Sequence, residues 1–535
     1  MRNTPYTAPL AACLLLLLLP FCIPRPAVGA LLPAGADVRR TQSDHFVYLY
    51  EASLAAQVPL LIKHCEDAHA ALTPAFNWTP RQKTLVLFTD AMDLHNGMAT
   101  VYPRPLMVFF AMSAHTATTI FEGGNDLRRT VFHEYAHILG LDAQYGFDAA
   151  LSRIFGRGLS IAGDPLSALL MYLAAPPGAL APRWYQEGLA MWVETEFVGP
   201  GRGRNSRTDM LMRMAVADDQ VLSPPYWDIS LPEWPYGTAP YLYGLKVFDH
   251  IFERYGVDGG GGNTPAQLSD DVARSFFFNF NNRAWARTEN RFSDLAMDAL
   301  VAEKERQTAR IATLRQHPLT ELKRLSPPSL VTAQPKFGPL GQRIYFTGRG
   351  EAGRRTLYLY DLKAHAQVKL DGARVTDALT TDMAMSADRR TLYYTRLDIQ
   401  GRDLLRNEIY AYTLSDRRLR RIAAQGRYRY ISVHPDGVQL AAVSERAGLS
   451  LLVTVPMAGL GDPNAETVLA TAAEGESFSH PQFDPRDDAL VYVRTDAKGA
   501  ELIQLDLSGN APRSLLKWPC AIPVSYTHLT LPTII

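Results

Sequence analysis

The chain of 535 residues is 47% hydrophobic and 20% charged, and its 54 basic side chains are balanced by 54 acidic ones. This length exceeds what one hydrophobic core usually organises, so two domains are expected. The composition excludes extensive disorder, and the charge balance argues against a nucleic-acid partner, because a protein that binds duplexes normally carries a basic excess. The densest basic cluster, at 417–421, is interpreted as a solvated hairpin turn.

The first thirty residues have the pattern of an export signal. Arg2 precedes an apolar run over 10–23, and the small residues at 28–30 offer a cleavage site. We therefore expect residues 1–30 to be a signal peptide and the protein to reach the periplasm or cell envelope. Retention as a membrane anchor is the alternative, but the run contains a proline and is shorter than the roughly 20 residues that span a bilayer, so no stable membrane span is expected. Lipidation at Cys13 is disfavoured, because this cysteine precedes most of the apolar run.

Cleavage would leave two cysteines, Cys65 and Cys520, which fall in different predicted regions. No disulfide framework follows from such a pair. The cysteines also lack zinc-ribbon spacing, so any metal site must use histidine and carboxylate ligands.

Residues 31–315 predict an α+β domain in which a sheet is backed by helices. Strands are expected at 45–50 and 84–88, and a third at 101–111 that its prolines place at a sheet edge. Helical spacing of apolar residues predicts helices at 60–72, 127–139, 182–196, 241–255 and 292–314. The helix at 127–139 is expected to start at a cap on Asn125 or Asp126, to stop at Gly140, and to lie behind the edge strand.

The segment 152–182 is apolar and rich in glycine and proline. A buried helical insertion is the favoured interpretation, and a flap that touches a membrane is the alternative. The glycine run at 259–262 predicts a flexible loop, and 316–330 predicts a linker around two prolines.

Beyond the linker, short strands follow similar turns that are marked by Pro339, Ala387, Pro435 and Pro485, with spacings of 48, 48 and 50 residues. A period near fifty with several strands per unit is typical of a propeller blade. The four repeats over 331–520 resemble the TolB-type β-propeller, which usually closes with more blades, so the propeller is expected to be incomplete. Residues 521–535 continue no repeat and resemble translated sequencing-adapter sequence, and we expect the natural protein to be longer.

An apolar helix at 131–140 contains the pattern His-Glu-x-x-His. Because His133 and His137 are four residues apart, both can offer a ring nitrogen to one ion while Glu134 points at a bound water. The pattern is short enough to arise by chance, so two core histidines satisfied by hydrogen bonds are the alternative. A catalytic zinc also needs a third protein ligand.

The third ligand is absent from the position that a metzincin would use. Ala143 has no donor atom there, and Asp142 is one residue out of register. The alternative is a glutamate on a second helix, and Glu187 is the candidate.

The run Trp184-x-x-Glu-Gly-x-Ala-x-Trp-x-Glu194 resembles the second metal helix of gluzincins, particularly the peptidase MA-like proteins. The resemblance implies a zincin-like fold, one Zn²⁺ per chain, and Glu187 as the third ligand. Gly188 and Ala190 would let the two metal helices approach closely. Glu194 would orient a ligand histidine from behind it, the alternative being a surface carboxylate.

A second resemblance concerns Pro240-Tyr-Leu-Tyr-Gly244, which opens an apolar helix. It is similar to the Tyr-x-x-Gly helix of aminopeptidase-type gluzincins, in which the tyrosine steadies the oxyanion. Tyr241 fits that register, although Tyr243 and a packing role stay open. The interval before Glu187 is longer than in aminopeptidases, so endopeptidase and exopeptidase action both stay open. The expected edge strand at 101–111 resembles the one that pairs with an extended substrate in zincins.

These patterns predict an exported zinc metallopeptidase that acts on a peptide or protein substrate, with Glu134 and Tyr241 as catalytic residues and a metal bound by His133, His137 and Glu187. The propeller is expected to recruit the substrate or an envelope protein partner. The alternative is an envelope binding or scaffold protein that acts through its propeller and carries an inactive zincin domain. The presence of Glu134 beside both histidines argues against inactivity, because a general base has no structural duty.

Overall fold

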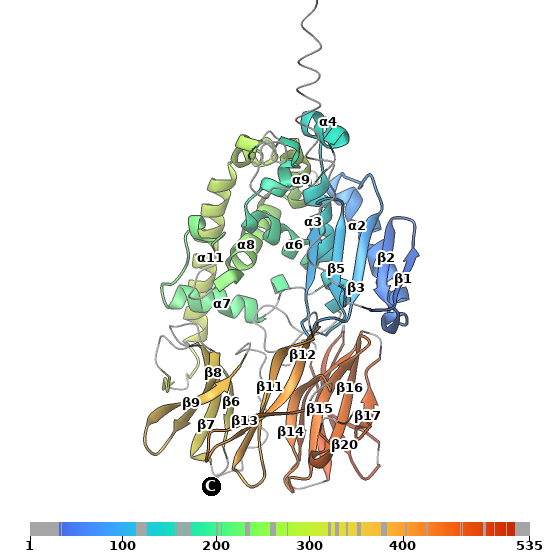
Figure 1. Ribbon diagram of the computed structural model, residues 1–535. Helices are drawn as coiled ribbons and strands as arrows, with labels where there is room; N and C mark the ends of the chain where they lie inside the picture. Colours follow the sequence, from blue (N-terminus) through green and yellow to red (C-terminus); the bar gives the residue numbers. More distant parts are fainter. Residues whose placement is uncertain are drawn as a thin grey trace, which may run out of the picture.

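The computed structural model describes residues 32–518 with gaps, the longer of which cover 114–125, 158–164, 166–172, 230–235, 257–263, 319–322, 327–330, 350–354 and 376–381. The described chain forms an N-terminal domain, in which helices stand beside a sheet, and a β-propeller below it (Figure 1). The predicted signal peptide, residues 158–164 and 166–172 of the apolar segment 152–182, Cys520 and the tail at 521–535 lie outside the described residues. Among the helices that are described, none is both long and apolar enough to cross a bilayer.

The N-terminal domain contains a five-stranded sheet with the order β1-β2-β3-β5-β4. Its strands are β1 (Val38–Gln42), β2 (Phe46–Glu51), β3 (Thr84–Thr89), β4 (Gly97–Thr100) and β5 (Leu106–Phe110). β2, β3 and β5 run parallel, whereas β4 pairs antiparallel with β5. The predicted strand at 101–111 is therefore shorter than expected and is not the edge. The edge strand is β4, because a short strand begins directly at the turn Asn96-Gly97 and pairs with β5.

Nine helices cover the described part of this domain. They are α2 (Val58–Phe76), α3 (Asp126–Asp142), α4 (Gly146–Phe155), α6 (Arg183–Val198), α7 (Ser206–Ala217), α8 (Ala239–Tyr255), α9 (Thr264–Ala273), α10 (Trp285–Thr288) and α11 (Phe292–Leu314). The predicted helix at 292–314 is confirmed at both ends. The predicted stop at Gly140 is wrong: the helix continues to Asp142, and a Cβ on Gly140 would lie 3.3 Å from Ser269 Oγ of α9, so the glycine serves close packing.

Helices α6 and α8 touch through their backbones. A Cβ built on Gly188 would lie 2.3 Å from the carbonyl carbon of Gly244, and one on Gly244 would lie 2.0 Å from the Trp184 oxygen. Only glycine fits at such distances. The close approach predicted at Gly188 was between the two metal helices, but the nearest atoms belong to α8, so the glycine instead joins α6 to the helix that carries Tyr241.

The remainder of the described chain forms four antiparallel sheets of four strands each, which confirms the predicted repeats. In order, the blades are β6 (Val331–Phe337) to β9 (Ala366–Arg374), β10 (Met383–Met385) to β13 (Leu419–Ala423), β14 (Tyr428–Val433) to β17 (Thr467–Thr471), and β18 (Ser477–Phe483) to β21 (Arg513–Trp518). Their middle strands are β7 (Arg343–Arg349), β8 (Arg355–Asp361), β11 (Thr391–Gln400), β12 (Leu404–Thr413), β15 (Gln439–Arg446), β16 (Leu449–Pro456), β19 (Ala489–Asp496) and β20 (Gly499–Asp506). Buried clusters join consecutive blades, as between Tyr345 and Tyr394 or between Tyr430 and Phe478.

The propeller is joined to the N-terminal domain by a hairpin that reaches upward from its second blade (Figure 1). The start of β12 lies along the segment that follows β3. The Asp93 amide donates to the Leu405 oxygen over 2.7 Å, and the Leu405 amide donates to the Ala91 oxygen over 3.0 Å. The propeller therefore holds the chain four residues before the edge strand β4 begins.

A buried charge cluster strengthens this junction. Arg427 of the propeller donates two 2.7 Å bonds to the Asp90 carboxylate and a third of 2.8 Å to Asp93. Arg406 Nη1 lies 3.1 Å from the Asp93 carboxylate, which also accepts the Asn407 amide over 2.8 Å. The Asp93 side chain is fully buried and that of Arg427 is 9% exposed. Removing one member would leave uncompensated charge away from water.

Replacing Arg427 with methionine is expected to lower the free energy of unfolding by about 3–5 kcal/mol, because Asp90 would stay buried without its cation and Asp93 would keep only Arg406. Urea denaturation followed by circular dichroism measures this. The matched control is Arg343→Met, which removes a 3.6 Å pair with Asp361 from an arginine that is 54% exposed, and should cost under about 1 kcal/mol. Equal losses in the two variants would contradict the importance of the buried cluster.

Candidate metal centre

The histidines of the motif lie on the face of α3 that looks toward α6 and β4. The His133 and His137 rings have centroids 4.8 Å apart and are nearly perpendicular. His133 is 6% exposed and His137 is only partly buried. The spacing of four residues therefore brings both rings to one place, as the sequence predicts.

Glu187 of α6 reaches the same place from the opposite side. Its Oε2 lies 3.5 Å from His133 Nε2 and 3.3 Å from His137 Nε2. One ligand atom from each of the three residues lies within 4.8 Å of the others. Glu187 Oε2 is buried and accepts no hydrogen bond of ordinary geometry from the described residues. A buried, unsatisfied carboxylate oxygen that faces two imidazole nitrogens fits a divalent metal ion, and this donor set suits zinc.

The pKa values of the cluster reflect the closeness of opposite charges. Burial alone would raise the pKa of the Glu187 carboxyl, but both histidines outweigh it and hold that pKa far below its usual range. Burial and the Arg202 charge lower the pKa of His133, whereas Glu187 and Glu194 outweigh them and raise it to about 9. The residues therefore attract positive charge to the point between them.

Glu134 lies beside this cluster and is 6% exposed. Burial raises the pKa of its carboxyl above the ordinary value. The His133 and His137 charges lower this pKa, and the Glu187 charge raises it further. A Cβ on Gly97 would lie 2.7 Å from Glu134 Oε1, so the first residue of β4 must be small for the carboxylate to occupy this position.

Glu194 lies behind His133, on the side away from Glu187. Its Oε2 is 3.1 Å from His133 Nδ1, and its side chain is 1% exposed. The alternative of a surface carboxylate is therefore wrong. When Nδ1 carries the hydrogen and donates it to Glu194, Nε2 keeps its lone pair on the side of Glu187, which is the tautomer that a metal ligand needs.

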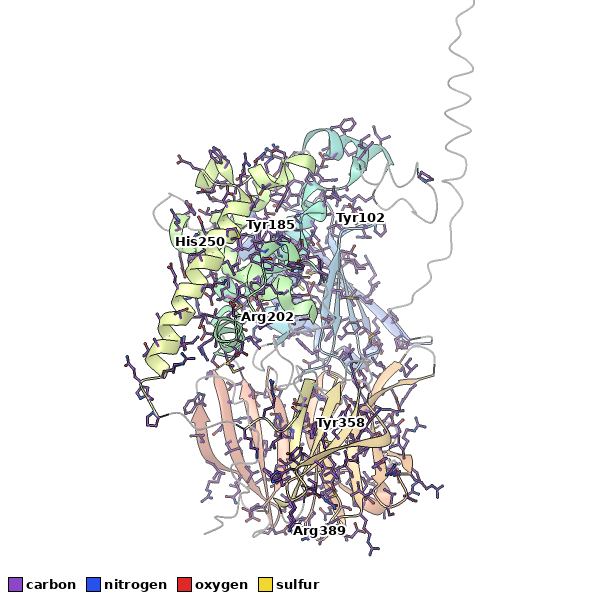
Figure 2. The ribbon with its side chains drawn as sticks, turned by 90° about the vertical axis from the view of Figure 1, so that its left-hand side faces the viewer. Tyr102, Tyr185, Arg202, His250, Tyr358 and Arg389 are labelled. Atoms are coloured by element: carbon purple, nitrogen blue, oxygen red, sulfur yellow. The ribbon has the colours of Figure 1, made fainter. Side chains whose placement is uncertain are left out.

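Arg202 was missed by the sequence analysis. It lies in the short helix η4 (Arg202–Arg204), within the helical half of the N-terminal domain (Figure 2). Its Nε and Nη2 each donate a 2.6 Å bond to the Glu194 carboxylate, and Nη2 lies 2.8 Å from His133 Nδ1. The guanidinium is 5.7 Å from the centre of the Tyr241 ring. Arginine in a glycine-rich stretch gives no periodic signal, so only its burial identifies it.

The two tyrosines of α8 have different surroundings. The Tyr241 ring lies nearly parallel to the His133 ring, 6.4 Å away, and borders the pocket. Burial and the Glu187 charge raise the pKa of its hydroxyl, which therefore stays protonated as a donor. Tyr243 is 1% exposed, stacks on Trp227 and accepts the Leu222 amide over 3.0 Å. Tyr243 therefore has a packing role.

Asp142 lies outside the cluster. It accepts hydrogen bonds from Arg157 and from Trp78 Nε1, so its role is structural. Ala143 is buried, as expected of a residue with nothing to donate.

The cluster opens into a pocket of about 400 Å³. One wall is the edge strand β4 with the residues before it, and the others come from α3, α6 and α8. The outer side of β4 pairs with no described strand. Backbone donors and acceptors thus lie beside the histidines, where an extended chain could pair with them.

No protein-family model matches the chain, and no curated protein matches it. Among solved structures, TolB from Acinetobacter baumannii has 20% identity, covers 36% of this chain and 44% of its own, and gives a TM-score of 0.29. A putative TolB from Agrobacterium tumefaciens has 18% identity, with 34% and 64% covered and a TM-score of 0.29. A nidogen/laminin complex has 16% identity, with 36% and 68% covered and a TM-score of 0.29. This chain thus spans less than two thirds of either TolB protein, and its propeller assignment rests on its own four sheets.

We expect the purified protein to hold one zinc per chain, and His137→Ala and Glu187→Ala each to lose it, because a site with two protein ligands binds far more weakly than one with three. Elemental analysis after dialysis against a weak chelator gives the stoichiometry. Glu196→Ala is the matched control, since this glutamate is on the same helix but pairs with Arg204 at the surface. Full zinc content in either ligand variant would refute the site.

Proposed function

We propose that the protein is a zinc-dependent metallopeptidase. The observation that carries the proposal is the convergence of His133, His137 and Glu187 beside Glu134, at the wall of a pocket that the outer edge of β4 borders. Ligands, base and a binding edge are what hydrolysis of a peptide bond requires. The resemblance of the segments 131–140 and 184–194 to gluzincins supports the same chemistry.

The chain's own residues supply the proton transfers and the binding. Zinc held by His133, His137 and Glu187 would polarise the scissile carbonyl and acidify the attacking water. Glu134 accepts the proton of that water and later passes it to the leaving amine. Its raised pKa suits both tasks, because a carboxyl nearer to neutrality returns the proton more easily. Tyr241 donates a hydrogen bond to the oxyanion.

The substrate is a peptide in extended form along β4. Such pairing uses main-chain hydrogen bonds and needs no particular side chains. The strand lies next to Glu134 at Gly97, so a peptide on this edge has its backbone beside the base. Whether the enzyme cuts within chains or at their ends depends on how far the groove stays open beyond the cluster.

The second candidate is an envelope protein that binds a partner through its propeller and has no hydrolytic activity. The four blades favour it, since propellers commonly present binding surfaces and fold alone does not decide function. The surroundings of Glu134 count against it. This carboxylate lines the pocket beside His133, His137 and Glu187, which is the position that a general base needs.

Glu134→Gln is expected to lower the kcat for peptide hydrolysis by about 10²- to 10⁴-fold while zinc stays bound, because the amide is nearly isosteric but cannot accept the proton. Tyr241→Phe should lower kcat by about 10²- to 10³-fold, as for one oxyanion donor. Tyr243→Phe is the matched control and should stay close to wild type. A fluorogenic peptide assay with zinc analysis measures all three. If hydrolysis survived both the Glu134→Gln substitution and chelation of zinc, it would not come from this site. The envelope binding protein would then be the better interpretation.

We also propose that the protein is exported and cut near Ala30, from the apolar run and the small residues after it. N-terminal sequencing of protein recovered from the envelope fraction should begin close to residue 31. An intact Met1 in the cytoplasmic fraction would contradict export.

A further inference from the structure

A second pocket lies where the two domains meet. It has a volume of about 90 Å³ and is walled on one side by Leu60, Phe110 and Met112 of the N-terminal domain. On the other side it is walled by Gly475 and Ser477 of the fourth blade. Apolar side chains from the N-terminal domain supply slightly more than half of the lining, Gln57 and Glu476 belong to its polar part, and the volume suits one aliphatic side chain.

His95 separates this pocket from the metal centre and borders both. Its Nδ1 donates to the Met112 oxygen over 2.7 Å, and its Nε2 lies 3.3 Å from the Thr130 hydroxyl. The ring is therefore fixed from two sides. His95 is the one residue that the linings of both pockets share.

The propeller wall of this pocket is held in place. Arg429 donates to the Ser113 oxygen over 3.2 Å, and the Ser113 hydroxyl lies 3.3 Å from Glu445. The buried cluster at Asp90 and Asp93 fixes the same junction. The pocket is thus built before any ligand arrives, which lowers the entropic cost of binding.

The register of β4 gives the distance from the reaction. Gly97 lies beside Glu134, and His95 precedes it by two residues, which is at most about 7 Å of extended chain. An extended peptide on this edge therefore reaches His95 about two residues from the scissile bond.

We propose that the pocket between the domains is a specificity subsite for a large aliphatic side chain, such as leucine, two residues from the scissile bond on the propeller side. The proposal rests on the proposed peptidase function and assigns the propeller a direct part in substrate choice. Both domains would then contribute to one groove, with His95 as the wall between the reacting bond and the subsite.

The test compares capped hexapeptides that carry leucine or alanine at the second position on either side of the cleaved bond. The wild type should prefer leucine at one of these positions by about tenfold in kcat/KM, as expected for a pocket that fills with a few methylenes. Ser477→Leu fills the pocket from the propeller and should abolish the preference. Leu60→Ala enlarges it and should shift the preference toward phenylalanine. Ser508→Leu, on an exposed turn of the same blade, is the matched control.

A binding measurement separates the subsite from the chemistry. The same peptides are titrated calorimetrically into zinc-loaded Glu134→Gln protein, with and without Ser477→Leu. The subsite is supported if the leucine peptide binds more tightly than the alanine peptide and if Ser477→Leu removes this difference. This holds even if no variant hydrolyses peptides, because the absence of hydrolysis would contradict only the peptidase proposal. Equal binding of the two peptides, or a leucine preference that survives in Ser477→Leu and in Leu60→Ala, overturns the subsite.

Discussion

The contact of α6 with α8 through Gly188 and Gly244 is the constraint on which the rest of the centre depends. Two helices that meet without side chains between them lie closer than the usual 8–10 Å between axes. Glu187 precedes one glycine, and Tyr241 lies one helical turn before the other, so the contact fixes both side chains relative to each other. A methyl group at either glycine would have to displace backbone, and the displacement would be passed directly to Glu187 and Tyr241.

The charges around the cluster explain why a divalent cation suits it. The carboxylates of Glu134, Glu187 and Glu194 are largely removed from water. Arg202, which lines the same pocket, supplies a fixed positive charge through its bonds to Glu194. Burying carboxylates in excess of cations is costly unless another positive charge is present. A dication between the histidines and Glu187 would provide that charge and would leave Arg202 to hold Glu194. Burial, and after it the Glu187 charge, raises the pKa of Glu134 against the opposing charges of both histidines.

The sequence predicts much of this arrangement where the signal is local. Helix periodicity places α11 correctly at both ends, and the spacing within the motif brings His133 and His137 together. Turns at regular intervals reveal the blades, because each blade is one repeat of the same pattern. The buried position of Glu194 needs the neighbouring helix, so sequence alone leaves it open between a buried carboxylate and one at the surface.

The features that the sequence did not predict depend on tertiary contacts. β4 is four residues long and carries no alternation, so its place at the sheet edge follows only from its pairing with β5. Gly140 continues its helix because α9 packs against it, and tertiary contact overrides propensity. Arg202 and the cluster at Arg427 depend on partners that no local pattern connects to them.

The junction between the domains sets an order of events during synthesis. Asp93 and Arg427 are 334 residues apart in the chain, so Asp93 emerges from the ribosome long before its cation exists. Domains fold largely in the order of their synthesis, and until the second blade is complete the two aspartates have only water to satisfy them. The segment that leads into β4 is then anchored on one side alone. The segment beside Glu134 is therefore anchored on both sides only after the first two of the four described blades have been made, which couples assembly of the candidate centre to synthesis of the propeller.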